Sequence, residues 1–183
     1  MGGAYYYLAA SLPALAWGGK PPLAVSSFLE DCRRVLPGED AQEVEAALGG
    51  RGDIVSAKNS VLKQWLESER QRRNELVWLR AAASQKDPRA YARGERYPEP
   101  YWAQAVAEAF RSEDPLQGEI LLDHFRWRYL NELEHGHYFD LEFLIVYGLK
   151  LEMLERHERY RSNKGKEIFA GYKKAELSQY AEA

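Results

Sequence analysis

The chain has 183 residues, enough for one hydrophobic core of ordinary size, and 45% of them are apolar, which is too many for a disordered protein. Its 28 acidic and 25 basic side chains give a formal net charge of -3, which does not favour a nucleic-acid-binding domain, because such domains are usually net basic. A single cysteine, Cys32, excludes a disulfide framework and a cage of several thiolates around a metal ion.

The N-terminal segment 4–13 contains three consecutive tyrosines and has no helical spacing of its apolar residues. Aromatic side chains fit the pleated surface of an extended chain, so we expect a short extended arm here. The segment has no basic start, is interrupted by Pro13 and is shorter than the ~20 apolar residues of a membrane span. It therefore predicts neither a signal peptide nor a transmembrane helix, and we expect a cytoplasmic protein.

Two short helices and one long helix are predicted next. The short helices cover 27–35 and 40–48, and each begins with a capping residue followed three positions later by Glu. Residues 56–84 form the long helix, because their apolar side chains recur at steps of three and four. The middle of this helix, residues 67–75, is strongly polar. It either faces water or pairs its charges inside a helix bundle.

The rest of the chain predicts further helices over 101–111, 114–134, 140–158 and 165–180. Asp114 is followed by Pro115 and Gln117, which is typical of a helix start, and Asp140 can cap the next helix.

The predicted fold is therefore an all-α bundle of about six helices with a short extended N-terminal arm. It forms a single domain, in which residues 1–53 provide the arm and the short helices and residues 54–183 provide the main bundle.

His135 and His137 are the strongest metal-ligand candidates, because two imidazoles beside the Asp140 carboxylate could hold a divalent ion. The two histidines lack the helical spacing of four residues that aims two nitrogens at one ion, and Asp140 is better used as a cap. We therefore expect no metal and no cofactor. Cys32 would need an activating neighbour and lies on a short helix with Arg33 and Arg34, but nothing else about it suggests catalysis. No phosphate-binding loop is present either, so we expect no catalytic residue and no enzyme.

Clustered arginines suggest an alternative function, that of a helical nucleic-acid-binding or regulatory adaptor protein. The residues in question are Arg70, Arg72, Arg73, Arg126 and Arg128. Carboxylates lie between these arginines, a mixture that is typical of solvated or paired helix faces. With the acidic net charge, this favours a protein without a nucleic-acid partner.

Several aromatic residues lie outside the predicted helical stripes, near the N-terminus and in the turn before Asp140. Tyrosine and other aromatic residues are favoured at protein interfaces, and they could equally fasten the N-terminal arm to the bundle. Both alternatives remain open. The predicted partner interface consists of Tyr5, Tyr6, Tyr7, Leu12, His137, Tyr138 and Phe139.

Several segments, in order along the chain, also resemble one bacterial protein family. They are residues 5–13, 73–76, 114–116, 125–130, 137–140 and 147–156. The family is little characterised, is associated with V/A-type ATPases and is similar to their C-type subunit of the central stalk.

This resemblance implies a helical, socket-like protein that sits on the membrane ring, receives the central shaft and transmits torque without catalysis. It implies a non-catalytic subunit or accessory factor whose partners are the shaft and ring subunits. Such a protein would be peripheral to the inner membrane, held there by its partners. Members of the family tend to be longer, and residues 38–53 are the place of the shortening.

Overall fold

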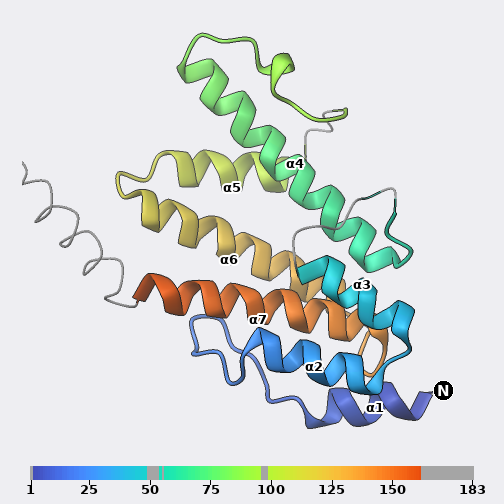
Figure 1. Cartoon of the computed structure of the whole chain (residues 1–183). Coiled ribbons are helices and arrows are strands. Elements are labelled where there is room, and N and C mark those ends of the chain that lie inside the picture. Colours follow the sequence, from blue (N-terminus) through green and yellow to red (C-terminus); the bar gives the residue numbers. More distant parts are fainter. Residues whose placement is uncertain (1, 49–53, 55, 96–98, 162–183) are drawn as a thin grey trace, which may run out of the picture.

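The computed structural model describes residues 2–48, 54, 56–95 and 99–161 (Figure 1). Within these residues the chain forms seven α-helices, one 3-10 turn and no strand, which confirms the all-α prediction. The elements are α1 (Gly2–Ser11), α2 (Val25–Val35), α3 (Gly38–Leu48), α4 (Ser60–Ala83), η1 (Pro88–Ala90), α5 (Pro100–Phe110), α6 (Pro115–Glu134) and α7 (Leu141–Arg161). The helix predicted for 165–180 lies outside the described residues. None of the described helices is long and apolar enough to cross a bilayer.

α7 is the central helix of the bundle. It runs between α6 and α2 in Figure 1, and it also contacts α3 and α4. Every residue from Leu144 to Leu151 is buried, as expected of a helix that is surrounded on all sides. The large core around α7 also contains Phe28 of α2 and Val44 of α3, so the predicted parts 1–53 and 54–183 share one core.

A second, smaller core lies between α5, α6 and the upper half of α4. It is built around Trp102, which is fully buried, and it includes Val106 and Leu122. α5 contacts both α4 and α6. The C-terminal part of α4 extends beyond the other helices in Figure 1. This core holds it against the bundle through Leu76 and Leu79.

The N-terminal segment is not the extended arm that we predicted, because Gly2–Ser11 forms helix α1. Leu8 and Ala9 are buried in the large core, and the Tyr5 hydroxyl donates a hydrogen bond to Asp40 of α3. These tertiary contacts outweigh the weak local preference of the tyrosines for extended backbone.

An irregular segment, residues 12–24, follows α1 and turns at Trp17 and Gly18. Along this segment the Tyr147 hydroxyl donates to the Pro13 carbonyl at 2.9 Å, and Arg161 Nη2 donates to the Gly18 carbonyl at 2.9 Å. The backbone N–H of Val25, where α2 begins, donates to Glu155 Oε1 at 2.7 Å. The segment therefore follows α7 over most of its length.

Helix starts agree with the predictions in the second half of the chain and differ in the first. Asp114 caps α6 by accepting from Leu116 N at 2.9 Å, as predicted. The predicted caps at Ser27 and Asp40 are wrong: α2 starts after Ala24 with no side-chain cap, and Asp40 lies inside α3. α4 starts at Ser60 because Asn59 accepts from two backbone amides, four residues later than the apolar spacing alone predicts.

Candidate functional site

The polar middle of α4 is turned into the protein. Ser68, Glu69, Gln71, Asn74 and Glu75 are all buried. These five side chains therefore lie inside the bundle and do not face water, and charge pairing there is seen for Glu69.

Glu69 is the α4 member of an ionic network. Its carboxylate accepts from Arg72 Nη2 at 2.8 Å on the same helix and from Arg126 Nε of α6 at 2.7 Å. Arg126 also lies over the Trp65 ring, 5.1 Å from its centroid. A guanidinium offers several donors in a fixed plane, so it can bind a carboxylate and an aromatic face together.

Asp123 extends the network to α7. Its Oδ1 accepts from Arg126 Nη1 at 2.9 Å and from Arg156 Nη2, and its Oδ2 lies 2.9 Å from His157 Nε2. Side chains of α4, α6 and α7 thus share one connected set of charges. The ionic network, as the term is used below, consists of Glu69, Arg72, Asp123, Arg126, Arg156 and His157.

The ionisation states follow from burial and pairing. Burial alone would raise the pKa of Glu69, but Arg126 and Arg72 outweigh it and lower the pKa to about 2. Burial likewise opposes the charge of Arg126, yet Glu69 and Asp123 raise its pKa above the ordinary value. Both groups stay charged at neutral pH, which is the arrangement expected of a satisfied buried network.

Cys32 behaves differently, because the opposing effect of Arg33 on its pKa is smaller than that of burial. The side chain is fully buried, and burial raises the pKa of the thiol to about 12. The group is therefore a neutral thiol and not an activated nucleophile.

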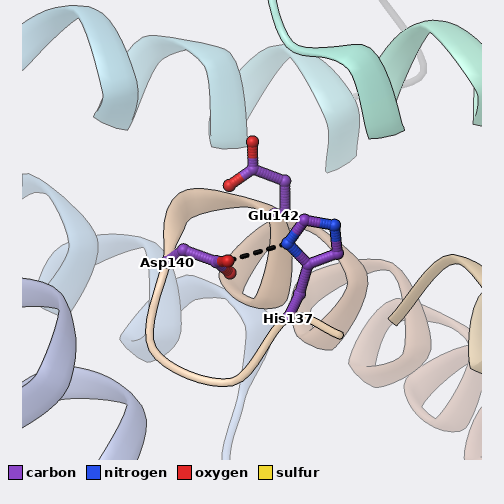
Figure 2. A group of neighbouring side chains, drawn as sticks. All are labelled: His137, Asp140 and Glu142. Atoms are coloured by element: carbon purple, nitrogen blue, oxygen red, sulfur yellow. Dashed lines mark hydrogen bonds and ion pairs between the residues drawn. The ribbon is translucent and has the colours of Figure 1, made fainter. Parts of the chain in front are cut away.

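The predicted metal-ligand candidates separate in the structure. His137 joins Asp140 and Glu142 at the start of α7, with one ligand atom of each within 4.8 Å of the others, whereas His135 is exposed and outside this group (Figure 2). His137 Nδ1 lies 2.7 Å from Asp140 Oδ2. Glu142 was missed from the sequence, where its position two residues after Asp140 was the available signal.

Protein donors already engage both carboxylates of this group. Asp140 Oδ1 accepts from Phe143 N at 2.9 Å and so caps α7, as predicted, and Glu142 Oε1 accepts from Asn59 Nδ2 at 3.0 Å. The positive end of the α7 dipole favours carboxylates here without a cation. The arrangement is explained as a helix cap, and the expectation of no metal stays a prediction.

Exposed aromatic rings from two distant parts of the sequence meet on one surface. Tyr6 of α1 lies against Phe139 of the turn before α7, with ring centroids 4.7 Å apart, and Tyr7 packs edge-on against Tyr6 at 5.8 Å. Tyr6 and Phe139 are each 50% exposed and Tyr7 is 74% exposed. We call Tyr6, Tyr7 and Phe139, with the neighbouring exposed Tyr138, the aromatic patch.

The other residues of the predicted interface serve the bundle. Tyr5 and Leu12 are partly buried and pack against the large core. Burial, together with the hydrogen bond to Asp40, raises the pKa of Tyr5 to about 12. The fastening alternative therefore holds for Tyr5, whereas Tyr6 and Tyr7 are exposed and their place in a partner interface stays a prediction.

The arginines of the adaptor hypothesis are largely engaged within the chain. Arg72 and Arg126 belong to the ionic network, and Arg70 Nη2 pairs with Glu67 at 2.5 Å. Arg73 and Arg128 are the exposed members of the set.

The fold and these sites define an all-α bundle that buries a charge network among three helices and exposes aromatic rings at one end. The chain belongs to the family described as "Protein of unknown function (DUF2764)", whose family model matches residues 82–174, about half of the 183 residues. This range includes α5, α6, α7 and the 137–140 turn, whereas α1 and Glu69 precede it. No curated protein and no solved structure matches the chain.

Proposed function

We propose that the protein is a non-catalytic subunit or accessory factor of a bacterial V/A-type ATPase, coupling the central rotor shaft to the membrane ring during ion transport. The aromatic patch is the observation that carries the proposal. Its Tyr and Phe rings are grouped, and each is at least half exposed. Such a surface is typical of one that a protein partner covers. The identity of that partner comes from the resemblance of the sequence to the ATPase-associated family.

The interior of the molecule suits a part that transmits force. The ionic network links α4, α6 and α7 through hydrogen-bonded charges, and the segment 12–24 is bound to α7 at Pro13 and Gly18. Hydrogen-bonded charge networks and close-packed cores resist deformation. A load applied at the aromatic patch would therefore reach the far helices with little loss.

In this proposal, the protein works on the cytoplasmic side and associates with the inner membrane only through its partners. The aromatic patch lies on α1 and on the turn between α6 and α7, so that a partner would contact one end of the bundle. The subunits of the shaft and the ring are the expected partners.

Purification of the full chain from its own cells tests the proposal. An affinity tag belongs at the C-terminus, because α1 begins at Gly2 and carries part of the aromatic patch. After mild detergent extraction, mass spectrometry should identify V/A-type ATPase subunits in the eluate in near-stoichiometric amounts, with ATP hydrolysis in the same fractions. A protein that migrates apart from every ATPase subunit at each stage contradicts the proposal.

A further inference from the structure

A groove of about 630 Å³ runs along α4, bounded on its other side by the end of α3 and the middle of α7. Its floor is aliphatic, formed by Leu66, Leu76 and Val77 of α4 and Leu149 of α7. Leu66, Leu76 and Val77 are only partly buried, so the floor offers apolar surface to an occupant.

The rim of this groove is basic. Arg73 and Arg80 of α4 are seven residues apart, about two helical turns or roughly 10 Å along the axis, and Arg93 faces the groove from the segment after η1. All three arginines are exposed, and none of them forms an ion pair with another residue in the described ranges. In a protein with a net charge of -3, this is a local concentration of unpaired positive charge.

Arg93 is held in place by contacts of its own backbone. The buried side chain of Asn74 accepts from Arg93 N at 3.0 Å and donates to Arg93 O at 2.9 Å, and Arg70 Nη1 donates to the same carbonyl at 3.1 Å. Gly94 has φ +65°, and a Cβ there would lie 1.8 Å from Arg70 Nη1. The backbone carrying Arg93 is therefore fixed to α4, and the three arginines form a defined rim.

We propose that this groove binds an acidic amphipathic helix of a partner protein. An amphipathic helix can place its apolar side chains on the aliphatic floor and its flanking carboxylates against Arg73, Arg80 and Arg93. Beside the aliphatic floor Arg126 pairs with Glu69, and Glu152 is the second carboxylate of the lining, so the charges of Arg73, Arg80 and Arg93 are left for the partner. The site is separate from the aromatic patch and does not depend on the ATPase assignment.

A single strand of nucleic acid fits the groove less well. Such strands need successive exposed aromatic rings on which their bases stack. Trp65 in the groove is only 3% exposed and is covered by Arg126, which leaves Tyr91, at 58%, as the exposed ring of the lining. The aliphatic floor has no role in binding a phosphate backbone.

Peptide titration of the full chain tests the proposal. The probes are two fluorescent helical peptides with the same leucine face, one flanked by glutamates and the other by lysines, and fluorescence anisotropy gives Kd at low and at moderate salt. The glutamate peptide should bind at least tenfold more tightly than the lysine peptide, and the difference should shrink as salt screens the charges. The double variant Arg73→Glu, Arg80→Glu should reverse this preference.

A matched control is the double variant Arg111→Glu, Arg128→Glu, which reverses two exposed arginines outside the groove. It changes the net charge by the same amount and should keep the wild-type preference, and circular dichroism verifies that both variants are folded. The proposal is overturned if the two peptides bind equally or if both double variants act alike. Tighter binding of a single-stranded RNA oligonucleotide that is lost with Arg73→Glu, Arg80→Glu also overturns it, as does a dimer in sedimentation that this variant dissociates.

Discussion

The ionic network buries charged side chains, which usually face water, whereas the aromatic patch exposes rings, which are usually buried. The network buries Glu69 and Asp123 at 5% and 3% exposure, and the aromatic patch leaves Tyr7 74% exposed. The buried carboxylates find their partners within the chain, on α4, α6 and α7. Among the exposed rings, Tyr6 contacts both Tyr7 and Phe139. The first region is paired inside the bundle, whereas in our proposal a partner covers the second.

Removing the shared carboxylate of the network should have the largest effect on stability. Asp123→Ala removes the carboxylate that pairs with Arg156 and His157. It also removes one of the two carboxylates that pair with Arg126. Loss of one member of a buried charge network costs about 3–5 kcal/mol. Urea unfolding measures the change, with Glu119→Ala, an exposed carboxylate on the same helix, as the control. Equal unfolding midpoints for the two variants would show that the network is not stabilising.

The free energy of unfolding should depend on pH because the pKa of Glu69 is low in the folded chain. Its pKa in the folded chain is about 2, below the ordinary 4.5, so the folded state binds fewer protons than the unfolded state between these values. The contribution of Glu69 is fully present above pH 4.5 and is lost as the pH falls toward 2, on the order of 3 kcal/mol in all. Urea unfolding of wild type and of Glu69→Gln at pH values from 7 to 3 should show that their free energies of unfolding converge as the pH falls. A constant difference across this range contradicts the assignment.

Gly148→Ala tests the packing that surrounds α7 and should have an intermediate effect. A Cβ on Gly148 would lie 2.8 Å from Phe28 and 3.0 Å from Leu48, so α2 and α3 would have to move. Overpacking costs about 1–3 kcal/mol, against a gain of up to ~1 kcal/mol in helix propensity. In thermal unfolding, Gly148→Ala should lower the Tm, whereas Gly38→Ala, with open space around the added methyl, should not. A Tm for Gly148→Ala at or above the wild-type value would contradict this packing.

Substitutions in the aromatic patch should have the smallest effect on stability. Tyr7→Ser and Phe139→Ser remove rings that are at least half exposed, and surface changes of this kind are usually within about 0.5 kcal/mol. Urea unfolding of the purified variants measures this. A loss well above 1 kcal/mol would mean that the rings serve the fold, as Tyr5 does, and would weaken their assignment to a partner.

Local patterns predicted the parts of the fold that local interactions determine. α6 begins where Asp114 and Pro115 indicate, and α7 begins at its Asp140 cap. α1 was missed because its helix depends on the contacts of Leu8 with the large core, which the spacing of the tyrosines does not reveal. The start of α2 at Val25 was missed for a similar reason, since its backbone N–H is bound by Glu155, 130 residues away.

The candidate sites were predictable to a similar degree. The polar stretch 67–75 stood out on α4, but the pairing of Glu69 with Arg126 spans 57 residues and depends on the tertiary arrangement of α4 and α6. Tyr6, Tyr7 and Phe139 were identified because they stand outside the helical stripes. That they touch depends on α1 lying beside the turn before α7, which no local pattern contains.

Association of patch variants with the ATPase tests the central claim most directly, that the aromatic patch is where a V/A-type ATPase subunit binds. Wild type, the double variant Tyr7→Ser, Phe139→Ser and the control Phe110→Ser are purified through the same C-terminal tag from native cells. Phe110 is 47% exposed on α5, away from the aromatic patch in sequence, so it controls for loss of an exposed ring. The account predicts that wild type and Phe110→Ser retain ATPase subunits while the double variant, equally stable, loses them. Retention of these subunits at wild-type yield by the double variant would contradict it.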